Sequence, residues 1–331
     1  MLRRTSLTVR RIALAAVAAI ALAGCTTTDS TTDSAAEGKA GGGPTTDVTV
    51  QPIEAARSVT DARGVTVATP EPPRRIVCLV ALCDDMLTEL GMTPTATNSQ
   101  LLAHDAFLGP AEAARVPVVP GGFLSPEVEA ILSFKPDLVI GLKDTHGKLA
   151  PALKGATVFW PVQPETWQHS VGYLRDLAAL TGRTAQGEKA EGIFRQRLAT
   201  AEAEPSEKTA LVMYGNDENF GVATAGTDVT AGLFPKIARY PWQSRGVEGT
   251  YSLEEILAKD VDVLFVETLS FGGPAKAGER LSDKLAQNPL WSRIPAVKNG
   301  KVIEVDPEVW AKGRGTRSLG IVLDEATAAL R

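Results

Sequence analysis

Aromatic and cationic side chains gather in the loops that follow the predicted strands of this chain. Aromatic residues make up only 5% of the sequence, so their concentration in these loops is informative. In open parallel sheets, ligands lie beyond the carboxyl ends of the strands. Apolar walls with a few fixed cations suit a large, partly anionic organic ligand. The side chains expected to line such a cleft are Phe123, Lys143, His146, Trp242, Arg245, Tyr251, Trp310 and Arg314.

Motifs for catalysis or metal binding are missing from the sequence. It has no G-x-S-x-G nucleophile motif and no P-loop, and GVATAG lacks the third glycine of a dinucleotide-binding loop. The histidines and carboxylates do not form a sequence cluster suited to bare Zn²⁺ or Mn²⁺. The sequence therefore predicts a binding protein without a resident metal or cofactor, not an enzyme.

Predicted strands and helices alternate along the chain, and these elements must position the loops. The strand patterns RIVCLVAL, PDLVIGL and ATVFWPV alternate with helical patterns, and TALVMYG restarts the alternation later in the chain. We expect an α/β fold of two Rossmann-like lobes, residues 54–163 and 206–331, each a mainly parallel sheet flanked by helices. Long helix at residues 164–205 would join the lobes, and the ligand cleft would lie between them. SVTDARGVTVATP predicts a small hairpin at the start of the first lobe.

One sequence unit occurs twice. EAILSFKPDLVIG starts at Glu129, and EEILAKDVDVLFV starts at Glu254. In both segments a β-branched run directly follows an Asp, so the two lobes are predicted to be pseudo-repeats. Packing against a sheet explains the repeated apolar residues but not the two glutamates. Glu129 and Glu254 are either solvated helix-start acids or a functional pair.

The N-terminus carries an export signal and a lipidation motif. MLRRTSLTVRR is basic, IALAAVAAIALAG is a short apolar run, and Cys25 follows in LAGC. We expect a lipoprotein-type signal peptide at residues 1–24, a lipid anchor on Cys25 at the outer face of the cytoplasmic membrane, and a disordered tether at residues 25–53. Sec and twin-arginine export both stay open. Removing the signal's four arginines takes the net charge from −5 to −9, so nucleic acid is not an expected partner.

Two further cysteines lie in RIVCLVALCDD. A disulfide between Cys78 and Cys83 is permitted outside the cytoplasm, but a bridge over so short a separation needs a particular geometry. Two buried or half-buried thiols are therefore the preferred interpretation, with the disulfide as the alternative.

Nearly the whole body resembles the helix-linked class of solute-binding lipoproteins that serve ABC importers of ferric siderophores, haem and cobalamin. The segments that carry this resemblance, in order, are VTDARGVTVATPEPPRRIV, TELGMTP, SPEVEAILSFKPDLVIG, YSLEEILAK and NPLWSRIPAVKNGKVIEVDPEVWAKGRG. The resemblance implies a monomer that docks on a permease dimer with a cytoplasmic ATPase. It also implies that Glu129 and Glu254, one in each lobe, meet arginines of the two permease subunits.

The resemblance leaves several ligands open. Trp310 matches an aromatic residue that contacts the siderophore in hydroxamate-binding relatives, so a ferric siderophore of the hydroxamate type is the first expectation. Haem is the alternative, with His146 and either Tyr240 or Tyr251 as axial ligands. A cobalamin binder and a non-transport enzyme are the remote alternatives.

Overall fold

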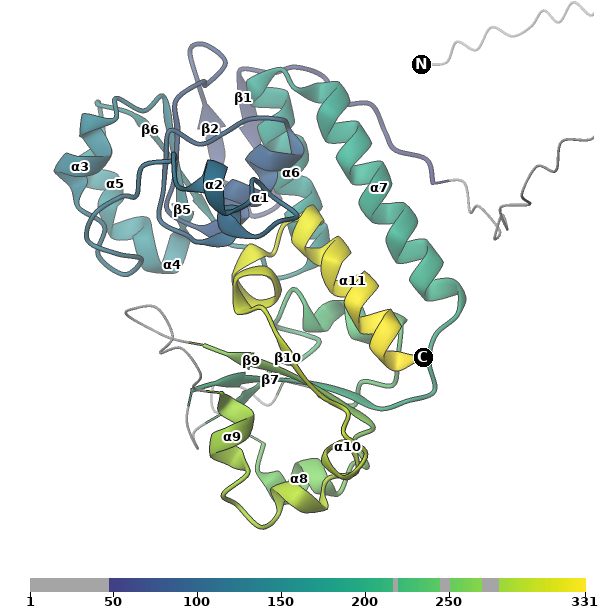
Figure 1. Ribbon diagram of the computed structural model, residues 1–331. Helices are drawn as coiled ribbons and strands as arrows, with labels where there is room; N and C mark the ends of the chain where they lie inside the picture. The colour runs from purple at the N-terminus through teal and green to yellow at the C-terminus, as the bar shows by residue number, and fades with distance from the viewer. Residues whose placement is uncertain (1–47, 217–219, 245–250, 270–279) are drawn as a thin grey trace, which may run out of the picture. The chain divides into compact units, whose positions relative to one another are not determined.

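Two four-stranded sheets and a separate β-hairpin form the framework of the computed structural model (Figure 1). The structure describes residues 48–216, 220–244, 251–269 and 280–331. Strands and helices alternate through both halves of the chain, which confirms the predicted α/β class. Among the described residues, no helix combines the length and the apolar character that a membrane span requires.

The N-terminal lobe contains an all-parallel sheet with the strand order β4-β3-β5-β6. Its two central strands are apolar and buried, which is typical of parallel sheets covered on both faces. The strands are β3 (Ile76–Cys78), β4 (Ala96–Thr97), β5 (Leu138–Leu142) and β6 (Val158–Val162). The helices are α1 (Ala81–Glu89), α2 (Pro110–Ala113), α3 (Val128–Ser133), α4 (Lys143–His146) and α5 (Ala150–Leu153).

The predicted hairpin is confirmed. Strands β1 (Ser58–Thr60) and β2 (Thr66–Ala68) pair antiparallel. The Asp61 carboxylate accepts hydrogen bonds from the backbone N–H groups of Arg63 and Val65, which closes the turn between the strands.

Two long helices follow the first sheet, α6 (Trp167–Thr181) and α7 (Thr184–Ala203). The Thr166 side chain caps α6, and Gly182 ends it with a φ of 69°, a left-handed conformation that favours glycine. The amphipathic segment PETWQHSVGYLRDLAALTG, which ends in this glycine, predicts the same boundary.

The first described residues are already held by these helices. The Arg175 guanidinium donates to the carbonyl oxygens of Gln51 and Pro52, and the backbone N–H of Ile53 donates to Glu188 at 2.6 Å. These contacts attach the end of the predicted tether to the folded body, so the body begins before residue 54.

The C-terminal lobe contains a mixed sheet with the strand order β10-β9-β7-β8, in which only β8 runs antiparallel to its neighbour. The strands are β7 (Ala210–Gly215), β8 (Gly221–Val222), β9 (Val263–Thr268) and β10 (Val302–Val305). The helices of this half are α8 (Leu253–Leu257), α9 (Leu281–Leu285), α10 (Pro295–Lys298) and α11 (Thr316–Leu330), with a π-helical turn at Glu308–Gly313.

The repeated Asp has the same structural role in both halves. Asp137 accepts hydrogen bonds from the backbone N–H groups of Arg74 and Arg75, each at 2.9 Å, directly before β3. Asp262 accepts from the backbone N–H of Thr209 at 2.8 Å, directly before β7. Each Asp therefore ties the start of its own strand to the start of the first strand in its sheet.

The chain conformation before each Asp is also repeated. Lys135 and Asp260 have positive φ angles of 49° and 47°, and each lies two residues before the repeated Asp. A left-handed residue is a common way to end a helix, here α3 and α8 respectively. The predicted pseudo-repeat is thus visible in hydrogen bonds and in backbone angles.

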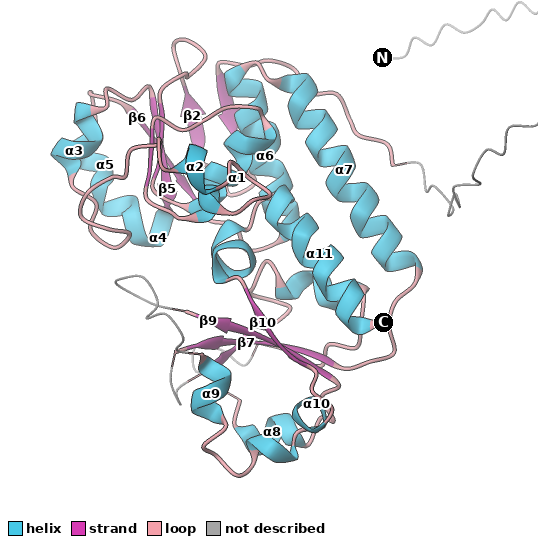
Figure 2. Cartoon of the chain, in the orientation of Figure 1, coloured by secondary structure: helices cyan, strands magenta, loops and turns pink. Residues whose placement is uncertain are grey.

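Helix α11 returns to the first half of the chain and packs on α7, α6 and α1 (Figure 2). The carboxylate of Asp85 on α1 accepts hydrogen bonds from the backbone N–H of Ser318 at 2.8 Å and from its hydroxyl at 2.6 Å. A Cβ on Gly315 would lie 2.2 Å from the Asp85 carboxyl, so this close approach requires glycine. Glu89 forms an ion pair with Arg317 at 3.3 Å beside it. Buried polar contacts therefore connect α1 to the N-terminus of α11.

Cys78 and Cys83 form a disulfide, with their Cα atoms 5.4 Å apart. The preference for two free thiols was therefore wrong. The β3–α1 turn brings the last residue of the strand next to the first turn of the helix, a spacing that matches disulfide geometry. The bridge lies in the core of the N-terminal lobe.

Candidate functional site

The carboxyl ends of the parallel strands carry the residues that the sequence nominates for ligand binding. In the N-terminal lobe, Lys143 directly follows β5 and is exposed. Phe123, in the loop before α3, keeps 40% of its surface exposed. Both side chains therefore offer surface to a ligand, one cationic and one aromatic.

His146 lies on α4 and is fully buried. Its Nδ1 accepts a hydrogen bond from the backbone N–H of Leu142 at 2.9 Å, so the ring hydrogen is assigned to Nε2. Nε2 lies 2.7 Å from the carbonyl oxygen of Phe123 and donates to it. Burial lowers the pKa of His146, which favours this neutral form. Both ring nitrogens are engaged, so His146 positions a loop and has no free nitrogen for an iron atom.

The loop that His146 supports has a defined shape. Gly121 and Gly122 have positive φ angles, and a Cβ on Gly121 would lie 2.2 Å from the carbonyl oxygen of Ser125. The Asn98 side chain donates to the Gly122 carbonyl oxygen at 2.8 Å. Two anchors, from the ends of β4 and β5, therefore hold Phe123 over the carboxyl edge of this sheet.

Three aromatic residues expected in the cleft belong to the core instead. Trp242 and Trp310 are fully buried and Tyr251 nearly so, so they offer almost no surface to a ligand. Trp310 stacks on Phe265 at 5.0 Å between ring centroids, and its indole N–H donates to Glu325 at 2.7 Å. The interpretation of Trp310 as a ligand contact is corrected, because β9 and α11 cover the ring from distant parts of the sequence.

The rings of Trp242 and Tyr251 pack edge to face, with their centroids 5.1 Å apart. The Trp242 indole N–H donates to the carbonyl oxygen of Ala210 at 2.7 Å, and the Tyr251 hydroxyl donates to that of Gln243 at 3.0 Å. Tyr240, the other tyrosine considered for haem, is buried and donates its hydroxyl to the Ala223 carbonyl oxygen at 2.7 Å. These polar atoms are engaged within the lobe.

Arg314 is half-buried and directly follows the π-helical turn. Its φ of 56° is left-handed, and its Nε donates to the carbonyl oxygen of Ala311 at 2.7 Å. Among the described residues, no acid lies within ion-pair distance of its guanidinium. Arg314 thus remains a candidate for binding an anion, whereas Arg245 lies outside the described residues.

Sequence reasoning missed two polar residues at the carboxyl edge of the second sheet. Tyr214 on β7 and Glu267 on β9 lie opposite each other in the strand register. Tyr214 is 38% exposed, whereas Glu267 is only 4% exposed. The signal was present in TALVMYG and VDVLFVET, where a single polar residue interrupts an apolar strand near its end.

The two repeated glutamates occupy equivalent positions. Glu129 is the second residue of α3, Glu254 is the second residue of α8, and both are exposed. No ion pair to either carboxylate occurs in the described parts of the chain. The two helices therefore present an exposed acid at equivalent positions of the two lobes.

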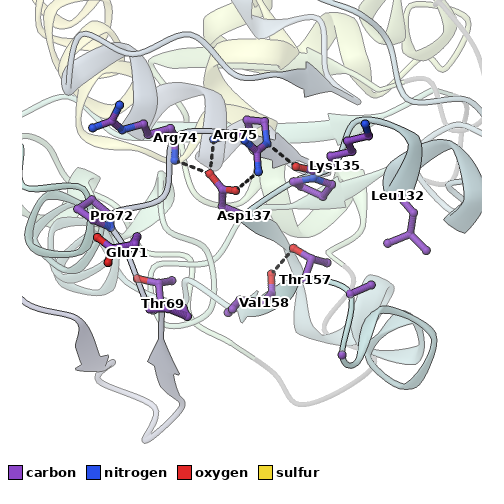
Figure 3. A pocket seen from close by; sticks show the side chains of 14 residues that line it. Thr69, Glu71, Pro72, Arg74, Arg75, Leu132, Lys135, Asp137, Thr157 and Val158 are labelled. Atoms are coloured by element: carbon purple, nitrogen blue, oxygen red, sulfur yellow. Dashed lines mark hydrogen bonds and ion pairs between the residues drawn. The ribbon is translucent and has the colours of Figure 1, made fainter.

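A cavity of about 900 Å³ opens at the opposite, amino end of the first sheet (Figure 3). Its lining includes Arg75 and Asp137, which bind each other, and the Arg75 Nε donates to the carbonyl oxygen of Lys135. These groups fasten the strand starts together, which gives them a structural role. The cavity does not contain the residues nominated for ligand binding.

The sequence matches the family model of a periplasmic binding protein over residues 76–309. The chain belongs to this family. Periplasmic binding proteins similar to it include "Probable siderophore-binding lipoprotein YfiY" of Bacillus subtilis, which is 26% identical over 81% of this chain and 86% of the relative. The Fe(3+)-citrate-binding protein YfmC of the same organism is 24% identical over 79% of this chain and 82% of the relative.

Solved structures of periplasmic binding proteins share the fold. The triscatecholate siderophore-binding protein FeuA from Bacillus subtilis, complexed with ferri-bacillibactin, superposes with a TM-score of 0.65. That match covers 83% of this chain and 98% of FeuA at 19% identity. The predicted architecture of parallel-sheet lobes flanked by helices is therefore confirmed.

Cys25, the expected lipidation site, lies outside the described residues. The relative YfiY is named as a lipoprotein. The anchor therefore rests on the sequence motif LAGC alone.

Proposed function

We propose that this protein is the extracytoplasmic substrate-binding component of an ABC importer and that its ligand is a ferric siderophore. The observation that carries the proposal is the family match over residues 76–309, together with relatives whose names specify Fe(3+)-citrate or a siderophore. A lipid anchor at Cys25 would hold the body at the outer face of the cytoplasmic membrane. Membrane fractionation of a Cys25→Ala variant tests this anchor, and an unchanged membrane fraction would contradict it.

The exposed side chains at the carboxyl edges fit an iron chelate. Phe123, in the loop before α3, and Lys143, directly after β5, belong to the first lobe. In the second lobe, Tyr214 lies on β7, and the half-buried Arg314 follows the π-helical turn. Aromatic faces bind the organic scaffold, and the two cations attract the negatively charged oxygens that coordinate Fe³⁺. We propose a hydroxamate-type chelate as the first ligand to test.

The same geometry does not favour haem. An axial histidine needs a nitrogen lone pair, but the Nδ1 of His146 accepts from Leu142 and its Nε2 donates to Phe123. The hydroxyls of Tyr240 and Tyr251 donate to backbone carbonyl oxygens. Haem ligation through these residues would require each to leave a buried hydrogen bond.

The decisive experiment is a calorimetric titration of the mature protein, freed of ligand, with ferric hydroxamates, a ferric catecholate, ferric citrate and haem. Saturable binding of a ferric hydroxamate at one equivalent is the expected result. Tighter binding of the catecholate or the citrate would leave the proposed role in an ABC importer in place but would change the proposed class of chelate. Saturable binding of haem with no response to any of the three ferric chelates would overturn the proposal.

A further inference from the structure

Tyr214 is the one exposed residue of strand β7. The rest of the strand, Ala210–Met213 and Gly215, is buried, whereas the tyrosine keeps 38% of its surface exposed. It is the penultimate residue of β7, so it lies at the carboxyl edge of the second sheet, where ligand is expected. An exposed aromatic side chain at this edge suits contact with an organic ligand.

Gly221 on β8 fixes where the Tyr214 ring lies. The two residues pair across the antiparallel β7–β8 ladder, so their side-chain positions lie on the same face of the sheet. An added Cβ on Gly221 would lie 2.2 Å from the Cζ of the tyrosine and 2.6 Å from its hydroxyl oxygen. The outer half of the ring therefore occupies the space that a side chain at residue 221 would fill.

Space, and not backbone conformation, requires glycine at this position. Gly221 is not among the glycines with a positive φ angle, so its backbone would accept other residues. β8 is the last strand in the sheet order, so the Tyr214 ring lies across the edge of the sheet with one face on the backbone of β8. Because the strand covers that face, the exposed surface of the ring belongs to its opposite face and its outer rim.

The tyrosine offers a neutral ring and not a phenolate. Partial burial raises the pKa of Tyr214 above its ordinary value, with further contributions from Asp228 and Glu267. The phenol therefore keeps its proton at neutral pH, which disfavours coordination of iron through its oxygen. The face of an aromatic ring carries negative electrostatic potential, so it stacks on planar conjugated groups and repels carboxylate oxygens.

We propose that Tyr214, lying on Gly221, forms a flat aromatic platform on which a planar conjugated iron-binding group of the chelate stacks, either a hydroxamate or a catecholate. Tyr214 is the specificity residue, and Gly221 is a positioning residue that acts through it. This inference rests on the proposed function and names the part of the chelate that the C-terminal lobe recognises. Citrate coordinates iron through carboxylates on an aliphatic chain, so the platform selects against ferric citrate.

The first test removes the platform. The Kd values of a ferric trihydroxamate, a ferric triscatecholate and ferric citrate are measured for the mature protein and for two variants of Tyr214. Tyr214→Ala should lower affinity about tenfold for each planar chelate that the protein binds, because the stacking face is lost. It should not weaken the binding of ferric citrate, because the ring repels carboxylates. Tyr214→Phe keeps the ring and should restore most of the affinity that the alanine variant loses.

The second test moves the ring without removing it. Gly221→Ala places a methyl group where the outer half of the ring lies, and the far end of a side chain can move aside, so we expect a folded protein with a displaced ring. Its affinity for the planar chelates should fall, but Gly221→Ala should have no further effect in a Tyr214→Ala background, because both substitutions act through one ring. Gly226→Ala is the matched control in the same lobe, because an added Cβ there meets no atom within 4 Å.

Three results would overturn the inference. One is an equal loss of affinity for ferric citrate and for the planar chelates in Tyr214→Ala. Another is unchanged affinity for the planar chelates in Tyr214→Ala and Gly221→Ala when thermal unfolding shows that both are folded. If Tyr214→Ala does not fold, the comparison of Gly221→Ala with Gly226→Ala decides. The third is binding of ferric citrate alone by the wild type, which would leave the proposed role in iron import in place. Absence of binding to every ferric chelate would instead refute the proposed function, and this inference with it.

Discussion

At the scale of single residues, burial separates the ligand candidates from the core. Phe123 and Lys143 offer surface at the carboxyl edge of their sheet, whereas Trp242 and Trp310 do not. His146 belongs to a third group, because it is buried but supports an exposed residue. Its ring also packs edge to face against the Phe123 ring at 5.1 Å.

We expect His146→Ala to destabilise the protein by roughly 1–3 kcal/mol, because it leaves the buried N–H of Leu142 without its acceptor. Thermal unfolding measures the loss, and hydrogen exchange should rise first in the loop around Phe123. His169→Ala is the control, because His169 is half-buried and accepts one longer hydrogen bond at 3.3 Å. Equal effects of the two substitutions would show that His146 does not hold the loop.

At the scale of elements, the repeated unit combines residues with a structural role and one residue without such a role. The Asp of each copy holds two strand starts together, and the left-handed residue ends each helix. The Glu of each copy does neither, since Glu129 and Glu254 are exposed in the first turn of their helices. An exposed acid at this position contributes only about 0.3–1 kcal/mol to stability.

Reversal of charge at both glutamates should therefore abolish transport without affecting ligand binding. Glu129→Arg and Glu254→Arg would each bring like charges together if arginines of the permease receive them. Uptake of the ferric chelate by cells and the ligand Kd of the purified variants are measured in parallel. Asp283→Arg, a reversal at another exposed acid, should leave uptake unchanged. Wild-type uptake in the double variant would mean that these are ordinary helix-start acids.

At the scale of the whole molecule, sequence patterns predicted the features that are set by residues close together in the sequence. The hairpin turn, the end of α6 at Gly182 and the placement of both glutamates all follow from short segments. The burial of Trp310 does not follow from its own segment, because Phe265 and Glu325 contact the side chain from other parts of the chain. The disulfide was missed for a related reason, since the geometry of the β3–α1 turn decides it.

Buried carboxyl groups connect the N-terminal half to the helices around it. Burial raises the pKa of Asp84 and of Asp85 to about 7. Asp84 accepts hydrogen bonds from the hydroxyls of Thr97 and Ser99, and Asp85 accepts from the N-terminus of α11. Both acids hold a proton in the folded protein at pH values where the unfolded chain has released it.

These two acids contribute to the pH dependence of stability. Because their pKa values are higher in the folded state, their contribution is fully present below about pH 4 and is lost as pH rises to about 7. The slope is at most about 1.4 kcal/mol per pH unit for each carboxyl. We expect Asp84→Asn, which cannot ionise, to flatten the dependence of the unfolding free energy on pH between about 4 and 7. Asp144→Asn, at an exposed acid of the same lobe, should keep the wild-type slope. Denaturant unfolding across this range measures both slopes, and a slope in Asp84→Asn as steep as that of the wild type would show that Asp84 is already ionised in the folded protein.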